Sequence, residues 1–528
     1  GGRDATWLAI GASIFASNIG SEHLIGLAGA GASSGMAMAH WEIQGWMILI
    51  LGWVFVPFYT RSMVYTMPEF LERRYNPQSR TILSVISLVS YVLTKVAVTV
   101  YAGGLVFQQV FGIKELWGID FFWIAAIGLV VLTALYTIFG GMKSVLYTSV
   151  LQTPILLLGS LIILVLGFKE LGGWDEMMRV CGAVTVNDYG DTMTNLIRSN
   201  DDANFPWLGA LIGSAIIGFW YWCTDQFIVQ RVLSGKNEME ARRGTIFGAY
   251  LKLLPVFLFL IPGMIAFALH QKYIGAGGEG FLPMLENGTA NADAAFPTLV
   301  AKLLPAGVKG LVVCGILAAL MSSLASLFNS SAMLFTIDFY KRFRPQTSEK
   351  KLVGIGQVAT VVIVILGILW IPIMRSVGDV LYTYLQDVQS VLAPGIAAAF
   401  LLGICWKRTS AQGGMWGLIS GMVIGLTRLG AKVYYSNAGE VADSTFKYLF
   451  YDMNWLFFCG WMFLFCIIVV IVVSLATKAP TAEKIQGLVF GTATKEQKAA
   501  TRASWNHWDI IHTVIILAIT GAFYWYFW

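Results

Sequence analysis

Polar residues interrupt an apolar segment close to the N terminus. Within residues 9–28, small and aliphatic residues give way to Ser17, Asn18, Gly20, Ser21, Glu22 and His23. An intact helix gains nothing from glycine and asparagine here, but a helix that unwinds frees carbonyl and amide groups to face an ion or a polar solute. Irregular backbone at membrane depth is tolerated only inside protein or along a watery cavity. The pattern therefore predicts a broken helix with a binding site at the break, as in secondary transporters; the alternative is an intact helix whose polar face packs on its neighbours.

Ionisable residues also fall inside other apolar segments. Charges at membrane depth are costly and are usually functional. The candidates are Glu22, His23, Glu42, Lys95, Asp225, Lys252, Asp387 and Arg428. For Lys95 and Arg428 we favour a structural interpretation, in which the long side chain snorkels towards an interface.

Two further segments carry groups that could bind a ligand. Residues 220–226 read Trp-Tyr-Trp-Cys-Thr-Asp-Gln. This mixture suits a sugar-type site, because sugar ring faces stack on aromatics and hydroxyls need hydrogen bonds; the alternative is an interfacial aromatic belt. Ser322 and Ser323, within residues 319–326, could offer hydroxyl oxygens to a small hard cation such as sodium. Small residues also serve close helix packing in membranes, so the serine pair alone is weak evidence.

The sequence lacks the patterns typical of an enzyme or a channel. It has no Ser/His/Asp constellation and no metal-ligand spacing, and five of its six cysteines lie in apolar segments, as small buried hydrophobes do. It has no repeated selectivity filter or ring of charges. The net charge of +5 gives no indication of nucleic-acid binding.

The composition is that of a membrane protein. Of 528 residues, 57% are hydrophobic and 12% are charged, with a mean hydropathy of +0.69, whereas a soluble domain carries about 25% charged residues. Apolar pieces of about 20 residues, long enough to cross a bilayer, recur along nearly the whole chain. We predict an all-α polytopic membrane protein with about thirteen spans, near residues 7–33, 40–60, 81–111, 119–140, 144–170, 207–231, 245–270, 307–340, 351–374, 379–403, 411–434, 455–477 and 508–527.

The positive charges of the connections predict the orientation. When the connections are numbered alternately, one side collects 22 Lys and Arg residues and the other side 10, in longer loops. Cytoplasmic loops carry the excess of positive charge, so we expect residue 1 in the cytoplasm and Trp528 outside, in the plasma (inner) membrane. Residues 171–206 and 271–306 are then outer loops, and residues 478–507 are a basic cytoplasmic linker. We expect no soluble domain on either side, which argues against a receptor.

Seven motifs resemble those of a known transporter family. They lie at residues 11–21, 65–70, 220–226, 250–253, 321–330, 335–340 and 400–407, and the first reads Gly-Ala-Ser-Ile-Phe-Ala-Ser-Asn-Ile-Gly-Ser. With these motifs the chain resembles the sodium/solute symporter family, and within it the sodium/glucose cotransporters, from about residue 7 to 435 and weakly beyond. The run at 220–226 is similar to the sugar branch more than to the proline or sialic-acid branches.

The resemblance implies a LeuT-like core of two inverted repeats of five helices each. Spans 1–5, near residues 7–170, would form the first repeat, and spans 6–10, near residues 207–403, the second. Residues 1–435 would hold this core with the helix that follows it, and residues 436–528 two further helices with the linker between them. Such transporters have about fourteen spans. Since the chain opens on Gly-Gly-Arg, we expect it to be N-terminally truncated, with one more helix before residue 1.

Carried over position by position, the family's functional residues fall on the polar positions described above. The substrate ligands would be Asn18, His23, Glu42, Tyr221, Trp222, Lys252 and Gln386, with Tyr221 as the inner gate. The co-transported sodium would bind the backbone carbonyls of Ala16, Ile19 and Ala319 and the hydroxyls of Ser322 and Ser323. The resemblance thus implies a transporter and not an enzyme. Its partners would be a sugar, sodium and the lipid bilayer but no nucleic acid, and we expect it to function as a monomer.

Three positions depart from the family's pattern. Ser149 stands where relatives often have Asp, and Ala325 where two-sodium members often have Thr or Ser, and both changes weaken a second sodium site. Gly218 stands one turn before the gate, where relatives carry Asn or Thr, so one sugar contact is expected to be missing or supplied by water. We therefore predict a symporter of a hexose (glucose/galactose type) that works by alternating access with one sodium per sugar. The alternatives are a sodium symporter for another polyol or sugar acid, and a non-transporting sugar sensor on the same scaffold.

Overall fold

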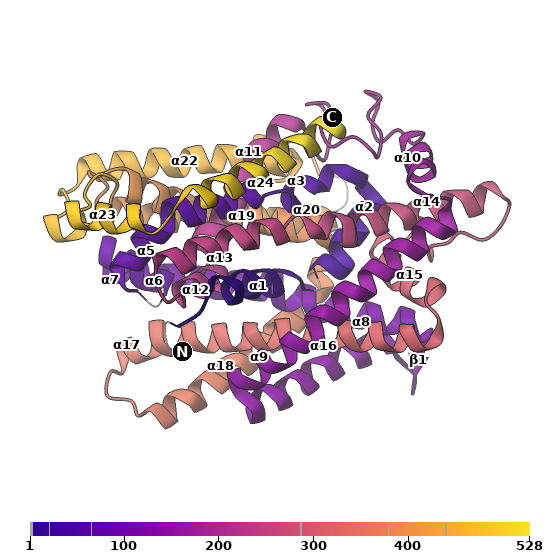
Figure 1. Ribbon diagram of the computed structural model, residues 1–528, viewed down its shortest axis with the longest axis horizontal. Helices are drawn as coiled ribbons and strands as arrows, with labels where there is room; N and C mark the ends of the chain where they lie inside the picture. The colour runs from indigo at the N-terminus through magenta and orange to yellow at the C-terminus, as the bar shows by residue number, and fades with distance from the viewer. Residues whose placement is uncertain (1–3, 21, 65, 286–287, 378–379, 439–440) are drawn as a thin grey trace.

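Nearly every element of the computed structural model is helical, and most helices run along the long axis of the molecule (Figure 1). The structure describes residues 4–528 except 21, 65, 286–287, 378–379 and 439–440; the side chains of residues 136–153, 329 and 375–377 are also not described. In the labels below, α denotes an α-helix and η a short π-helical or 3-10 segment.

The first half of the chain forms a series of short helical pieces and then longer helices. Its elements are α1 (Trp7–Asn18), η1 (Glu22–Leu27), α2 (Ala28–Ser34), η2 (Gly35–Met38), α3 (Ala39–Glu42), α4 (Gly45–Ile50), η3 (Leu51–Phe55), α5 (Val56–Ser62), α6 (Met67–Arg74), α7 (Pro77–Tyr91), η4 (Val92–Val96), α8 (Ala97–Phe111), β1 (Glu115–Leu116), β2 (Ile119–Asp120) and α9 (Phe121–Leu171). β1 and β2 pair as a small antiparallel hairpin, with Glu115 opposite Asp120.

The second half repeats this succession of short and long helical pieces. Its elements are α10 (Trp174–Gly182), α11 (Trp207–Gly218), η5 (Phe219–Thr224), α12 (Gln226–Leu233), α13 (Glu238–Leu251), η6 (Val256–Leu260), α14 (Ile261–Gly275), η7 (Ala292–Ala294), α15 (Ala295–Leu303), α16 (Ala306–Met333), η8 (Leu334–Tyr340), α17 (Lys341–Phe343), α18 (Glu349–Val377), α19 (Leu381–Cys405), α20 (Ala411–Asn437), α21 (Thr445–Lys447), η9 (Tyr448–Asp452), α22 (Trp455–Ala476), η10 (Ala482–Lys484), α23 (Lys495–Ala503) and α24 (His507–Tyr526).

Ten helical stretches of the described residues are long and apolar enough to cross a membrane. They account for ten of the predicted spans, and one of them, Glu22–Ser62, also includes part of the span predicted near 7–33. The spans predicted near 7–33, 119–140 and 411–434 correspond to the broken helix α1–η1–α2, to the first part of α9 and to the glycine-rich α20. The number of thirteen therefore stays our prediction.

The helix α9 contains two of the predicted spans. Its 51 residues would extend about 77 Å if straight, more than twice the roughly 30 Å of a hydrocarbon core. Phe121 packs on Phe111 at the end of α8, and Glu170 accepts a hydrogen bond of 3.1 Å from Tyr273 at the end of α14. These ends of α8 and α14 lie at the same end of the molecule (Figure 1). α9 therefore passes through the molecule twice, as expected for spans near 119–140 and 144–170.

The predicted break in the first span is confirmed. α1 ends at Asn18, Ile19 is extended (φ −81°, ψ 104°), and η1 begins at Glu22. The sixth span is broken in the same way at Asp225, which is extended (φ −74°, ψ 128°) and whose carboxylate accepts from the Phe227 N–H at 3.2 Å. Such a cap satisfies one of the backbone donors that open a helix. Breaks in the first helix of each predicted repeat are what an inverted-repeat core requires.

Residues 478–507, predicted as a linker, dock on the body of the protein. Phe490 donates its N–H to the Ile404 carbonyl at 2.8 Å, and its ring packs on Phe58 at a centroid distance of 4.9 Å. Lys484 Nζ donates to the Glu72 carbonyl at 2.9 Å. The segment therefore holds together the ends of helices from both predicted repeats.

A buried carboxylate joins three elements at the predicted outer side. Asp293, on η7, accepts from the backbone N–H of Leu381 through both oxygens, at 3.2 and 3.1 Å, and so caps the first turn of α19. It also packs against Gly29 of α2, where no larger residue would fit. Burial raises the pKa of the Asp293 carboxyl to about 7, against an ordinary value of 3.8.

This pKa predicts a pH-dependent stability. Because the folded protein holds the Asp293 proton more tightly than the unfolded chain, the contribution of this group to stability falls as the pH rises from about 4 to about 7. Over this range the contribution of Asp293 to the free energy of unfolding would fall by about 4 kcal/mol. Thermal unfolding of the purified protein across this range should therefore show a flatter pH profile for Asp293→Asn than for the wild type. Asp188→Asn, which changes an exposed carboxylate of the other long outer segment, is the control and should leave the profile unchanged.

Candidate functional site

One cavity lies where the broken helices meet. It is lined by Asn18, Glu22, His23, Trp41, Glu42, Gln44, Ile217, Gly218, Tyr221, Trp222, Lys252, Tyr382, Leu385, Gln386 and Gln389. All seven residues predicted to bind substrate are among them, although they come from five separate stretches of the chain. The cavity measures about 40 Å³, and a water molecule takes up about 30 Å³ of the liquid. In this conformation the site has room for a water molecule or two.

Glu42 is the centre of the polar network in this cavity. Its carboxylate is fully buried, and one oxygen accepts from Lys252 Nζ at 2.6 Å and lies 3.3 Å from His23 Nε2. The other oxygen accepts from the Tyr382 hydroxyl at 2.6 Å. A buried charge is tolerated only when it is paired and hydrogen-bonded. Glu42 therefore holds α3, η1, α19 and the residue after α13 in one arrangement.

The network continues to the first break and to Tyr221, the predicted gate residue. The Asn18 amide nitrogen lies 3.2 Å from His23 Nε2, and the Asn18 oxygen accepts from the Tyr221 hydroxyl at 3.3 Å. Asn18 and His23 stand on either side of the break, so their contact bridges it. On the other side of the cavity, Lys252 Nζ lies 5.3 Å from the centre of the Trp222 ring. The predicted polar and aromatic ligands thus face the same space.

Sequence reasoning missed Tyr382, although a signal was present. Tyr382, Gln386 and Gln389 follow one another at spacings of four and three on α19, and this spacing places them on one face of a helix. The Gln386 side-chain oxygen is buried and has no hydrogen-bond partner among the described residues. An unpaired buried acceptor is costly. It is therefore a group that a hydroxyl in the cavity would satisfy.

Sequence reasoning also missed Gln44, whose amide fills the space left by Gly218. Gln44 Nε2 donates to the Ser214 carbonyl at 2.7 Å, in the turn of α11 that precedes Gly218. A Cβ atom at position 218 would clash with the Gln44 side-chain oxygen. The space beside Gly218 is therefore occupied by the amide of Gln44, the residue that precedes α4, and the missing sugar contact stays a prediction.

Three of the five residues predicted to bind sodium, Ala16, Ile19 and Ser323, lie at or beside the first break. The last carbonyls of a helix have no partner within it and carry partial negative charge, which applies to Ala16 at the end of α1. Ile19 is buried within the break, and Ala319, Ser322 and Ser323 lie on α16. A Cβ atom on Gly20 would lie 3.0 Å from Ser323 Oγ, so the glycine leaves room for the close approach of α16 to the break. The role of these five residues stays a prediction.

The structure describes the side chain at one of the two positions that were expected to weaken a second sodium site. Ala325 is buried within α16, where its methyl group can offer no oxygen to a cation. Ser149 lies outside the described side chains.

The structure gives Lys95 and Arg428 the structural role that we expected, but both side chains are buried and neither snorkels to an interface. Lys95 does not snorkel: its ammonium group is buried 3.6 Å from the centre of the Phe227 ring and 4.9 Å from that of Tyr221. Lys95 lies on η4 and is 8% exposed. Arg428 donates to the carbonyls of Leu449, at 3.1 Å, and Met453, at 2.6 Å, and therefore ties α20 to the segment before α22.

A comparison with known protein families assigns the chain to one of them. The model of the family described as "Sodium:solute symporter family" matches residues 1–421. The chain belongs to this family. Human (Homo sapiens) sodium/myo-inositol cotransporter 2 is 37% identical over 504 residues, which cover 93% of this chain and 74% of that protein. Sodium/glucose cotransporter 1 of Ovis aries is 39% identical over 506 residues, which cover 90% of this chain and 74% of that protein.

A solved structure shows the fold. The substrate-bound, outward-open structure of a Na⁺-coupled sialic acid symporter matches with a TM-score of 0.67 at 21% identity, over 91% of this chain and 92% of that chain. At this identity the likeness shows the fold, and the expected LeuT-like helical architecture is confirmed. This member of the sodium:solute symporter family is a multi-pass membrane transporter that couples a small-molecule solute to sodium, and it is not an enzyme.

The pairing of Glu42 with Lys252 predicts a characteristic pattern of stabilities. Glu42→Gln leaves the buried Lys252 ammonium without its counter-charge, and breaking a buried pair in this way costs about 3–5 kcal/mol. Glu42→Gln/Lys252→Met removes both charges and should recover most of this loss. Thermal unfolding of the purified variants measures both effects.

An exposed pair provides the control for this comparison. Glu176→Gln breaks the surface pair between Glu176 and Arg179, which lie 2.8 Å apart, and surface pairs contribute about 0–1 kcal/mol. If Glu42→Gln were no less stable than Glu176→Gln, the Glu42 network would not hold the site together.

Proposed function

We propose that this symporter carries a hexose of the glucose/galactose type. The observation that supports the proposal is the single cavity lined by Glu42, Lys252 and Gln386 together with the rings of Tyr221 and Trp222. Carboxylate and amide oxygens accept from sugar hydroxyls, the ammonium group donates to them, and aromatic faces cover the apolar face of a pyranose ring. Hydrogen bonds to charged groups are the stronger ones.

The closed network suggests how such a site selects its substrate. Glu42 and Lys252 contact each other, as do Asn18 and His23, while the Gln386 side-chain oxygen has no partner among the described residues. A sugar can therefore enter only if the cavity enlarges and its hydroxyls replace these contacts. A substrate that lacks one of these hydroxyls leaves a buried polar group unpaired, and sites of this kind reject such analogues strongly. The site is therefore selective for polyhydroxylated rings.

A cyclic polyol is the second candidate substrate. The human relative of 37% identity is named sodium/myo-inositol cotransporter 2, and myo-inositol is also a six-membered ring with a hydroxyl on each carbon. The charged groups that accept sugar hydroxyls would accept those of a cyclitol as well. Competition between the two substrates therefore belongs in the first experiment.

Sodium coupling follows from the position of the predicted ion site. Ala16, Ile19, Ala319, Ser322 and Ser323 would bind one sodium per sugar at the break whose two sides carry Asn18 and His23. An ion can drive transport only by binding two conformations with different affinity, and the coupling is reciprocal, so the sugar tightens sodium binding in return. Sodium bound at the break would in this way favour the conformation that binds the sugar more tightly.

The remaining expectations concern the whole molecule. Residues 1–435 form the inverted-repeat core with its following helix, and residues 436–528 form the C-terminal unit. We place residue 1 in the cytoplasm and Trp528 outside, in the plasma membrane, and we take the transporting unit to be a monomer. The excess of Lys and Arg in alternate connections supports this orientation.

Uptake into proteoliposomes tests the function. With an inward sodium gradient, labelled glucose or galactose should accumulate above equilibrium, and with potassium in place of sodium it should only equilibrate. Unlabelled myo-inositol, added as competitor, distinguishes a hexose transporter from a cyclitol transporter. Ser322→Ala/Ser323→Ala should abolish the response to sodium, while Ser326→Ala, one turn further along α16, serves as control. Full sodium-driven uptake by the double variant would contradict the ion site, and binding without accumulation would favour a sugar sensor.

The contact of Gln44 with Gly218 predicts a compensating pair of substitutions. Gly218→Ser places its side chain against the Gln44 oxygen and should weaken sugar uptake about tenfold, since overpacking a tight site typically costs 1–3 kcal/mol. Gln44→Ala/Gly218→Ser removes the clash and returns a hydrogen-bonding group to position 218, so part of the uptake should be regained. Sodium-driven sugar uptake at several sugar concentrations measures both changes. Equal defects in Gly218→Ser and in the double variant would show that the two positions act independently.

A further inference from the structure

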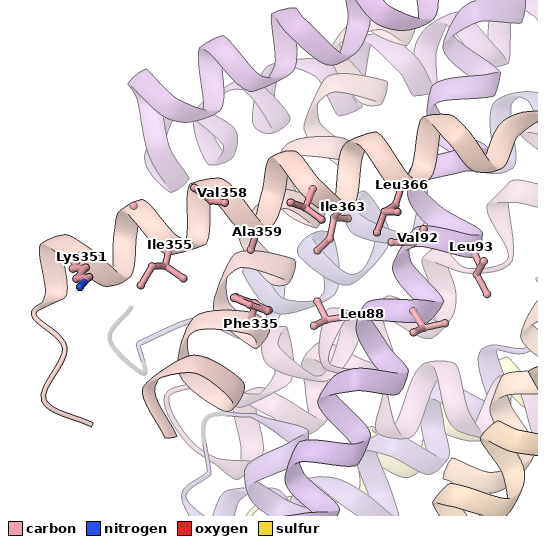
Figure 2. A pocket seen from close by; sticks show the side chains of 13 residues that line it. Leu88, Val92, Leu93, Phe335, Lys351, Ile355, Val358, Ala359, Ile363 and Leu366 are labelled. Atoms are coloured by element: carbon pink, nitrogen blue, oxygen red, sulfur yellow. The ribbon is translucent and has the colours of Figure 1, made fainter. Parts of the chain in front are cut away.

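A large groove lies on the side of the molecule, away from the proposed substrate site. It has a volume of about 780 Å³ and lies between α18, η8 and the stretch from α7 into η4. Figure 2 shows Lys351 at one end of α18 and Leu366 further along it, with Leu88, Val92 and Phe335 on the facing elements. None of its lining residues belongs to the cavity around Glu42.

The groove is apolar along its length and faces the bilayer. Lys351 is the only charged residue among those that line it, and nearly all of the others are aliphatic or aromatic. Val358 and Val362, on its rim, are 65% and 50% exposed, although they lie on a helix apolar enough to span a membrane. In the membrane these exposed side chains meet hydrocarbon and not water. The occupant of the groove therefore comes from the bilayer.

The dimensions of the groove fit an acyl chain. Lys351 and Leu366 are fifteen residues apart on α18, a distance of about 22 Å along the helix. The hydrocarbon core is about 30 Å thick, so the groove extends from one interface past the midplane. A chain that starts at the Lys351 end would lie along Leu88, Val92 and Ile363.

The charge at the end of the groove favours an anionic headgroup. Residues 341–351 contain five Lys and Arg residues and a single acidic residue, Glu349. Lys350 and Lys351 are exposed in the first turn of α18, whose free backbone N–H groups add partial positive charge. Basic residues next to a membrane each contribute about 1 kcal/mol to the binding of anionic lipids.

We propose that this groove binds an anionic phospholipid, with an acyl chain between α18 and α7 and with its phosphate at Lys351. The lipid comes from the leaflet that meets the start of α18. Its chain contacts η8 and η4 as well as α18, and so it fills the space between elements of both predicted repeats. The inference depends on the groove and its charge, not on the identity of the transported solute.

Native mass spectrometry of the full chain tests the proposal. The purified protein is exchanged into detergent with equal amounts of phosphatidylglycerol and phosphatidylcholine, and the bound lipid is measured. We expect the wild type to retain phosphatidylglycerol in preference. Lys351→Gln should reduce this preference about fivefold, the equivalent of about 1 kcal/mol. Val358→Trp fills the rim of the groove with a ring and should reduce the binding of both lipids.

Two matched substitutions serve as controls. Lys498→Gln removes an exposed lysine from α23, on the same predicted side of the membrane, and Val472→Trp adds a ring to a lipid-facing position of α22 that is 57% exposed. Both should bind lipid like the wild type. Thermal unfolding measured without sugar checks that each variant is folded. The proposal is overturned if Lys351→Gln and Val358→Trp match their controls, if the wild type retains the two lipids equally, or if an added fatty acid displaces phosphatidylglycerol completely.

Discussion

The buried carboxylate of Glu42 constrains the centre of this protein. Removing a charge from water is unfavourable unless partners replace the solvent, and Glu42 finds Lys252, His23 and Tyr382 on three other segments. These partners are 210, 19 and 340 residues away in the chain. A single charge therefore fixes the relative positions of helices from both predicted repeats, and any movement that separates them must offer Glu42 new hydrogen bonds. A polyhydroxylated solute is a molecule that can do so.

Two interrupted helices border this centre. At Ile19 and at Asp225 the backbone leaves the helical conformation, and the Asp225 carboxylate caps the helix that follows it. The first break is bridged by Asn18 and His23, which belong to the same network as Glu42. Glycine at position 20 allows Ser323 to approach the break from α16. The proposed ion and solute sites therefore share a border of a few residues, and this is the physical basis on which one could respond to the other.

Much of the site could be read from the chain, and what was missed had identifiable causes. Asn18, His23, Glu42 and Lys252 stood out because polar and charged residues are rare within apolar spans, and the resemblance assigned them, with Gln386, to the substrate. Tyr382 escaped notice because tyrosine is common near the ends of membrane helices, where its position needs no special explanation. Gln44 escaped because its relation to Gly218 exists only between two helices. The expected snorkelling of Lys95 was wrong. From the sequence, its long side chain could reach either an interface or an aromatic neighbour, and the structure shows the second.

The sequence by itself determined that this is an all-helical membrane protein, that its first helix is broken, and to which family it belongs. These features follow from local composition: the apolar length of each span, the glycine and asparagine within the first one, and the order of a few motifs. Only the tertiary structure decided which polar groups meet, that Gln44 occupies the space beside Gly218, that Lys95 lies under Tyr221, and that a groove separates α18 from α7. The reason is that these relations join residues far apart in the chain, and they depend on how helices pack, which no single segment encodes.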